Sequence, residues 1–205
     1  MEQLKLSNTQ KLAKMGIEVP GHLPQIEPLE DVSPRSSVEV ASRLCALSYV
    51  IGLGFGAKGK DLKPFLEQYD LLDDVTHHEK SLLELDILPE QERINASWLP
   101  ECAQALAWCI NVVELNHFDH CDNDLASKIP FKTDPSGFIS NAVLRPIEEI
   151  QQQSDLLYRM HWYARDCSLT GTESPLNEGV ISERRKAIDW VYGVEEDWDE
   201  IPMDT

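Results

Sequence analysis

Apolar residues recur at steps of three and four along most of this chain, which is the spacing of one face of an α-helix. The longest such run covers residues 144–168. One stripe of that run consists of Ile147, Ile150, Ser154, Leu157, His161 and Ala164. Leu156 and Met160 point in a third direction, so apolar side chains face almost all sides of the helix. The pattern predicts a buried central helix that other helices surround.

Polar residues of the same run form a second stripe, which contains Asp155, Arg159, Trp162 and Asp166. Asp155 and Arg159 are four residues apart with the acid first, which is the favourable orientation for an ion pair along a helix. A buried charge without a partner is costly, so these charges must be paired if the helix is central. We therefore expect a salt-bridge network, and acid–base catalysis by Asp155 and Asp166 is the less favoured alternative.

The remaining chain contains six further segments with helical spacing, at about residues 8–15, 36–52, 62–69, 76–85, 97–113 and 180–192. Ser36–Glu39 and Thr76–Glu79 are capping-box sequences, in which the first and fourth residues satisfy each other's backbone at a helix start. Asn8 and Ser97 are the expected N-caps of two other helices. The segments therefore predict where most of the helices begin.

No stretch alternates as a β-strand does, and the chain contains no internal repeat. The prediction is an all-α fold, with about seven helices in a single globular domain over residues 1–205. A proline-rich segment at 17–35 and an acidic tail at 195–205 extend that domain. A chain of this length can bury a sizeable core without help from disulfides or metals.

Acidic residues outnumber basic ones by 36 to 18, which gives a formal net charge of −18. Such a chain repels nucleic acid and anionic lipid, so we expect neither nucleic acid nor membrane as a partner. The charge suits a basic protein partner, although solubility alone is the commoner reason for it. The expected partner, if there is one, is a basic protein such as a toxin.

The expected location is the cytoplasm. Residues 1–10 do not resemble a secretion signal, and no run contains the ~18 apolar residues that a membrane helix needs. The five cysteines are scattered and odd in number, at Cys45, Cys102, Cys109, Cys121 and Cys167. Without a secretion signal, reduced thiols are the expectation. We expect no cofactor.

Residues 54–61 read GFGAKGKD and meet the GxxxxGK spacing of a phosphate-binding loop. Asp61 stands where that loop needs a hydroxyl for magnesium, and its carboxylate would repel phosphate. The preceding segment is helical in pattern, whereas the motif follows a strand. A glycine-rich connector is therefore favoured. The chain has no G-x-S-x-G sequence of the kind that carries a serine nucleophile.

Three residues that can bind metals cluster at His117, His120 and Cys121. A zinc site wants about four protein ligands, or three and an open position. The only further candidates are His77 and His78, which are distant in sequence. A polar loop is the favoured interpretation, and whether His117, His120 and Cys121 bind a metal is left open.

Six segments share their order and spacing with one known family: SxxEVASRL at 36–44, WxxECAxALAW at 98–108, RPIEEI at 145–150, DLLYRMHWYARD at 155–166, ERRKAIDWV at 183–191 and WDEIPMDT at 198–205. Together these segments make the chain resemble DUF4272, a bacterial family of unknown function. The resemblance covers most of the chain. It implies a helical domain and supplies no activity.

The polar residues in the matching segments are a candidate site, or equally a structural signature of the family. With Asp166, they are Arg145, Asp155, Arg159, His161, Trp162, Glu183 and Arg184. A second candidate surface is acidic: residues 61–92 hold ten acids and two bases, and the tail places one tryptophan among acids. Its proposed partner-binding residues are Asp70, Asp73, Asp74, Trp198 and Asp199.

Three functions compete on these observations. The favoured one is a non-catalytic protein-binding module, for instance an immunity protein that masks the cationic active site of a toxin. The second is a small-molecule enzyme with a polar site between helices, around Arg145, Asp155, Arg159 and His161. The third is a structural subunit. Two arrangements of the tail remain open: it is solvated, or it folds back and places the Trp198 ring in a groove.

Overall fold

The computed structural model describes residues 1–205 and contains α-helices and short 3-10 helices but no β-strand, so the all-α prediction is confirmed. The chain divides into two compact units. Unit 1 consists of Met1–Arg35, Asn116–His120 and Arg145–Thr205, and unit 2 of Ser36–Leu115 and Cys121–Leu144. Each unit is assembled from segments that are distant in sequence. The expectation of a single domain over 1–205 stays a prediction.

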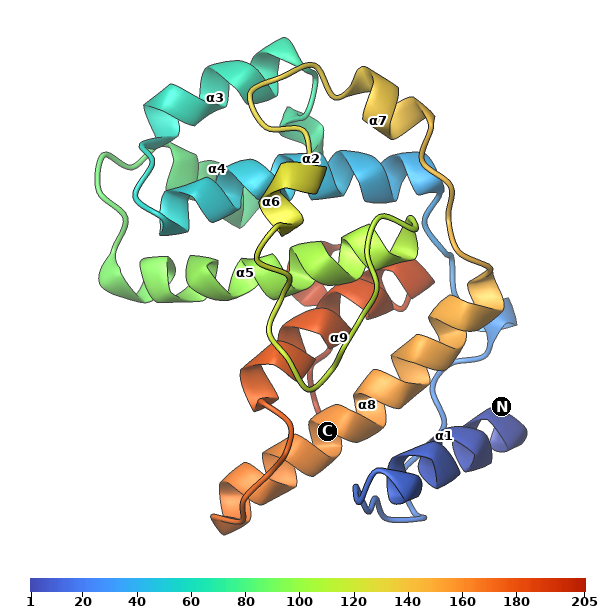
Figure 1. Ribbon diagram of the computed structural model, residues 1–205. Helices are drawn as coiled ribbons and strands as arrows, with labels where there is room; N and C mark the ends of the chain where they lie inside the picture. The colour runs from blue at the N-terminus through green and yellow to red at the C-terminus, as the bar shows by residue number, and fades with distance from the viewer. The chain divides into compact units, whose positions relative to one another are not determined.

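Unit 1 contains three α-helices, namely α1 (Glu2–Lys14), α8 (Ile147–Thr170) and α9 (Glu178–Tyr192). Within this unit α8 packs against both α9 and α1 (Figure 1). Its buried side chains include apolar and charged residues, as the sequence pattern indicated. Two 3-10 helices, Leu29–Asp31 and Trp198–Glu200, complete the unit. That α8 is the centre of the whole chain stays a prediction.

Unit 2 contains six α-helices: α2 (Ser37–Gly54), α3 (Gly59–Gln68), α4 (His77–Leu83), α5 (Glu90–Cys109), α6 (Leu125–Lys128) and α7 (Ser136–Ser140). A 3-10 helix, Leu72–Asp74, precedes α4. The two long helices α2 and α5 pack along each other, and α3, α4 and α7 also contact α2 (Figure 1). Because α2 contacts four other helices, ten of its eighteen residues are buried.

Both capping boxes are confirmed. The Ser36 hydroxyl accepts from the backbone N–H of Glu39, and the Glu39 carboxylate accepts from the Ser36 N–H at 2.8 Å. Thr76 and Glu79 make the same reciprocal pair at the start of α4. Glu79 also binds Arg43 of α2 through two contacts, at 2.7 and 2.8 Å, so this cap additionally ties α4 to α2.

Two expected N-caps are wrong. Helix α1 already begins at Glu2, so Asn8 lies inside it and is buried. Helix α5 begins at Glu90, and the Ser97 hydroxyl donates to the carbonyl oxygen of Ile94 within the helix. Serine and asparagine form such local bonds inside helices as well as at their starts, so these residues alone do not fix a boundary.

The structure has nine α-helices rather than about seven, because α6 and α7 lie between the predicted segments 97–113 and 144–168, where no helix was expected. They contain four and five residues, which is too short for a 3.6-residue period to be recognised. Their existence depends on packing in unit 2.

Helix α2 has the length and composition of a membrane span, so the expectation that no run reaches that length is wrong. Just over half of this stretch, 56%, is buried inside the structure, and the buried core helix of a folded protein has the same composition. One such helix is weak evidence for a membrane.

Candidate functional site

The first part of the candidate site is the ion pair between Asp155 and Arg159 on α8. Arg159 Nε donates to Oδ2 at 3.0 Å and Nη2 donates to Oδ1 at 2.6 Å. The two side chains are 1% and 0% exposed, respectively. Asn8 of α1 also donates to Asp155 Oδ2, at 2.8 Å, and Arg159 Nη2 donates to the carbonyl oxygen of Pro24. The pair therefore ties α1 and the proline-rich segment to α8.

A second polar group lies where α9 packs on α8. Arg185 Nε donates to Asp189 Oδ2 at 3.1 Å, and Ser154 donates to Asp189 Oδ1 at 2.6 Å. Arg185 Nη1 lies 3.0 Å from His161 Nδ1. Because a guanidinium can only donate, His161 Nδ1 is the acceptor in this contact. All four residues are buried.

The tyrosine ring of Tyr158 lies between these two groups. The guanidinium carbons of Arg159 and Arg185 are 6.0 and 5.0 Å from its ring centre, within the range of cation–π contacts. The ring is therefore a shared electron-rich partner of both cations. Tyr158 therefore lets two buried arginines lie near each other in the interior of unit 1.

Burial shifts the pKa of two groups in this network. Burial is the main cause that lowers the pKa of His161 to about 4, and the positive charge of Arg185 adds to it. Burial raises the pKa of Asp189 to about 6, although Arg185 and the hydroxyl of Ser154 act in the opposite direction. At neutral pH His161 is therefore a neutral acceptor and Asp189 is ionised. Both side chains form hydrogen bonds with other residues of the network.

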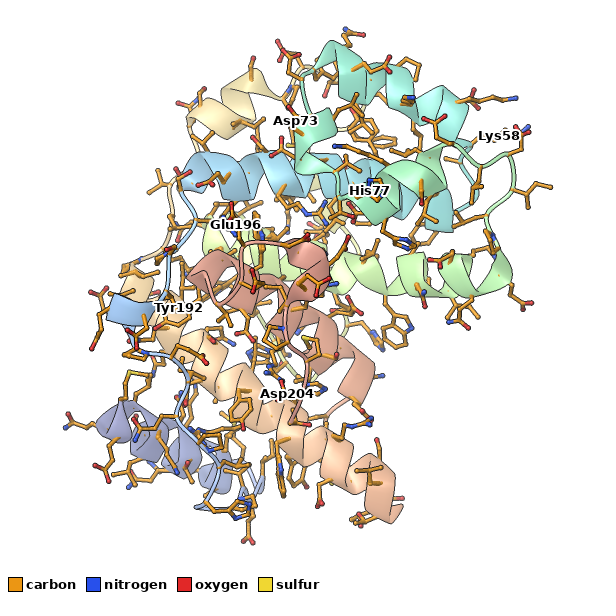
Figure 2. All side chains as sticks on the ribbon, turned by 180° about the vertical axis from the view of Figure 1, so that it is seen from behind. Lys58, Asp73, His77, Tyr192, Glu196 and Asp204 are labelled. Carbon is orange, nitrogen blue, oxygen red and sulfur yellow. The ribbon has the colours of Figure 1, made fainter.

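A cavity of about 160 Å³ adjoins this network. Ser154, Tyr158, Arg185 and Asp189 line one side, and residues of the proline-rich segment and the tail line the other. Arg185 Nη1 donates to the carbonyl oxygen of Asp204 at 2.8 Å, so the tail runs back over unit 1 (Figure 2). The cavity is smaller than the ~300–1,000 Å³ of typical small-molecule sites.

The structure brings together only part of the predicted site. Asp155, Arg159 and His161 belong to the buried network, whereas Trp162 is half-buried and Asp166 is exposed. Asp166 is thus not part of the predicted salt-bridge network.

The other predicted residues lie away from the network. Arg184 donates to the carbonyl oxygens of Asn116 and Asp119, at 2.5 and 3.0 Å, and so fixes the loop that contains these two residues. Arg145 pairs with Glu149 at 3.6 Å, and Glu183 is half-buried.

Five residues of the network were not predicted as site residues from the sequence: Asn8, Ser154, Tyr158, Arg185 and Asp189. One signal was available, since Arg185 and Asp189 are four residues apart on a helix, as Asp155 and Arg159 are. Asn8 gave no such signal, because its partner is more than a hundred residues away in the chain.

The structure arranges no group of three or more His, Cys, Asp or Glu side chains to hold a metal ion. His117 Nε2 lies 2.5 Å from Gln153 Nε2, and burial lowers its pKa to about 4. The backbone N–H of Cys121 donates to Glu101 at 2.9 Å, and His120 is exposed. The glycine-rich residues 54–61 span the end of α2 and the start of α3, so a helix rather than a strand precedes them.

Asp70, Asp73 and Asp74 lie in the turn between α3 and α4 (Figure 2). Asp70 and Asp73 are exposed. Asp74 is half-buried, and burial raises its pKa to about 6 against the effect of Arg43, with Asp73 and Glu39 adding repulsion. Asp70 and Asp73 thus lie on the surface of unit 2.

Of the tail residues proposed to bind a partner, Asp199 is exposed but Trp198 is only 4% exposed. Its ring packs edge-on against Trp190 at 5.4 Å, with the Lys186 ammonium 5.6 Å from its centre. Of the two arrangements considered for the tail, the structure has the ring folded back. In this arrangement Trp198 is not an exposed anchor.

These features define an all-helical protein whose buried polar residues hold its helices together. The chain belongs to the family described as domain of unknown function DUF4272, whose model matches residues 4–201 and so spans segments of both units. No curated protein and no solved structure matches the chain.

Proposed function

We propose that this protein is a non-catalytic binding module whose acidic surface recognises a basic protein. The supporting observation is where the charges lie. The buried charged residues are four arginines and four carboxylates, namely Arg43, Arg159, Arg184, Arg185, Glu79, Glu101, Asp155 and Asp189. These buried charges cancel, so the full excess of 18 negative charges lies on less buried residues. A surface of that kind attracts cationic partners and steers their association.

The residues best suited to chemistry support the same proposal. Asp155 accepts three hydrogen bonds, from Asn8 and twice from Arg159, and cannot serve as a free base. His161 faces a guanidinium through Nδ1 and has a pKa of about 4. We interpret this network as a scaffold, with α8 as the organising helix of the chain, rather than as an active site.

The turn that contains Asp70 and Asp73 is the proposed contact surface of unit 2. The ammonium of Lys63 is paired with the carboxylates of Glu84 and Glu67, and Lys80 is half-buried. Few cations in this region therefore offset the charges of Asp70 and Asp73. Like charges close together on a surface favour a partner that neutralises them. A toxin with a cationic active site is a concrete partner of this class, and neutralising it in the cytoplasm requires charge and shape but no catalysis.

The test is an affinity pull-down from native-host lysate, washed at low and at high salt and followed by mass spectrometry. Asp70→Asn/Asp73→Asn removes two charges from the turn, and Asn tolerates the positive φ of 54° at residue 70. Glu18→Gln/Glu173→Gln removes the same charge from exposed residues of unit 1 and is the matched control.

We expect one basic protein that is retained at low salt and lost at high salt, because salt screens exposed charges. The turn variant should retain severalfold less of it than the control variant does. An empty pull-down, or equal retention by both variants, would contradict the proposal.

The alternative function is a small-molecule enzyme with a polar site between helices. The one observation that favours it is the cavity of about 160 Å³ beside Ser154, Arg185 and Asp189. If the pull-down is empty, a small polar ligand that raises the melting temperature of the protein, but not of an Asp189→Asn variant, would support this alternative.

A further inference from the structure

One cavity of unit 2 has mostly apolar walls and has no role in the proposed function. It has a volume of about 440 Å³ and lies between α2, α5 and the segment 121–131. Ile51, Ala103, Leu125 and Ile129 contribute apolar walls. This volume lies in the ~300–1,000 Å³ range of small-molecule sites, which are mostly apolar with few polar groups. The cavity is thus large enough for a compact ligand.

Phe131, which lines this cavity, is positioned by contacts with Tyr49. The Phe131 ring packs on Tyr49 with 4.9 Å between ring centres, and the backbone N–H of Lys132 donates to the Tyr49 hydroxyl at 3.0 Å. At the opening, Phe55 is 74% exposed and Phe131 is 40% exposed. Two aromatic rings at the edge of an apolar cavity leave apolar surface in water, which a bound ligand would cover.

The polar end of the cavity is acidic. Asp122 lines it, and Lys128 lies 3.7 Å from Asp122 and 3.1 Å from Asp124. Two carboxylates therefore share one ammonium, which leaves an excess of negative charge beside the opening. This arrangement disfavours an anionic ligand and accepts a hydrogen-bond donor or a cation.

We propose that this cavity, named here the α2–α5 pocket, binds a compact aromatic or branched aliphatic molecule that carries no negative charge. The apolar walls bind the body of the ligand, and Asp122 faces its polar group. The pocket lies wholly in unit 2 and does not depend on the acidic turn or on a protein partner.

N-phenyl-1-naphthylamine is a suitable probe, because it is aromatic, uncharged and fluorescent in apolar surroundings. Its 8-sulfonate, anilinonaphthalene sulfonate, has the same rings and a negative charge. We expect saturable binding of the uncharged probe with a Kd on the order of 10 µM, which is ordinary for a ligand of this size. The sulfonate should bind at least tenfold more weakly. Absence of saturable binding, or equal binding of both probes, would overturn the proposal.

Ala126→Trp tests the location, because Ala126 is an exposed residue that lines the pocket and can be enlarged without disturbing the core. Ala13→Trp makes the same change at an exposed residue of α1 and is the control. Ala126→Trp should weaken binding of the uncharged probe at least tenfold, with the control unchanged. Equal binding by both variants would show that the probe binds elsewhere and would contradict the proposal.

The reactivity of the Cys121 thiol provides an independent measurement of probe binding in the pocket. It lines the pocket and is half-exposed, whereas the other four cysteines are buried thiols. Saturating N-phenyl-1-naphthylamine should slow the reaction of Cys121 with N-ethylmaleimide severalfold. Unchanged labelling at saturation would show that the probe does not occupy the pocket, even if it binds the protein.

Discussion

Arg159 and Asp155 form a two-point ion pair within one turn of α8, and neither side chain is more than 1% exposed. The remaining terminal nitrogen of Arg159, Nη1, is buried without a hydrogen-bond partner. Apart from one backbone carbonyl and the ring of Tyr158, Asp155 is thus the group that offsets the buried positive charge. Removing one partner of such a pair leaves an uncompensated charge in the interior, which is strongly destabilising.

Asp155→Asn keeps the shape of the side chain and removes its charge. We expect a loss of about 3–5 kcal/mol in the free energy of unfolding, the usual cost of breaking a buried pair. Urea denaturation at neutral pH measures it. Asp166→Asn, at an exposed position of the same helix, is the control and should change stability by less than ~0.5 kcal/mol. Equal losses in both variants would show that the Asp155–Arg159 pair is not what stabilises the interior.

The lowered pKa of His161 predicts a pH-dependent stability. The unfolded ring titrates near 6.5 and the folded ring near 4, so between these values only the unfolded state takes up the proton. The stability that His161 contributes is complete above pH 6.5 and is lost as the pH falls towards 4. Asp189, with its raised pKa of about 6, acts in the opposite sense over the same range. The pH curve of the unmodified protein therefore mixes the two effects.

The variant His161→Gln separates the effect of His161 from that of Asp189. The amide oxygen of Gln can still accept a hydrogen bond from Arg185, and the amide does not titrate. Relative to the unmodified protein, the variant should lose less stability between pH 7 and pH 4.5, measured by urea denaturation at both values. Parallel losses in the two proteins would mean that His161 takes up its proton equally well in both states.

The helices of this fold could largely be predicted from the sequence, since periodicity and capping boxes are local signals. The capping boxes at Ser36 and Thr76 were recognised because both partners lie within four residues. The network around Arg185 was recognised only in part, because its partners come from α8, α9 and the tail. Asn8 shows the limit clearly: it is a common N-cap residue, but its tertiary contact with Asp155 determines its position.

Gly193 ends α9 in the left-handed region at φ 88°, as does Gly171 at the end of α8 at φ 69°. A methyl group on Gly193 would collide with the backbone of Ser33, whereas none of the atoms around Gly171 would lie within 4 Å of one. Gly171→Ala should cost about 1 kcal/mol for the backbone conformation alone. Gly193→Ala should cost about 1–3 kcal/mol more, because the Ser33 segment must move. Thermal or urea denaturation of the two variants checks this difference, and equal costs would contradict it.

The tail is fixed to the rest of unit 1 by buried side chains and by hydrogen bonds from two arginines, Arg35 and Arg185. Trp198 and Ile201 are 4% and 5% exposed, and Arg185 donates to the carbonyl oxygens of Pro202 and Asp204. The aromatic contact between Trp198 and Trp190 is one apolar part of this attachment. Trp198→Ala removes the ring and leaves only the hydrogen bonds from Arg35 and Arg185 and the smaller apolar side chain of Ile201, so we expect the tail to detach.

Amide hydrogen exchange measures this detachment directly. Exchange over residues 195–205 should rise at least tenfold in Trp198→Ala, while α8 keeps its protection. Phe118→Ala removes a ring that is already 46% exposed and should leave the tail unchanged. Unchanged exchange in the tail would show that the hydrogen bonds from Arg35 and Arg185 hold it without the ring. A rise over α8 and the tail together would show that Trp198 belongs to the core of unit 1, since local release and global unfolding differ in which amides they expose.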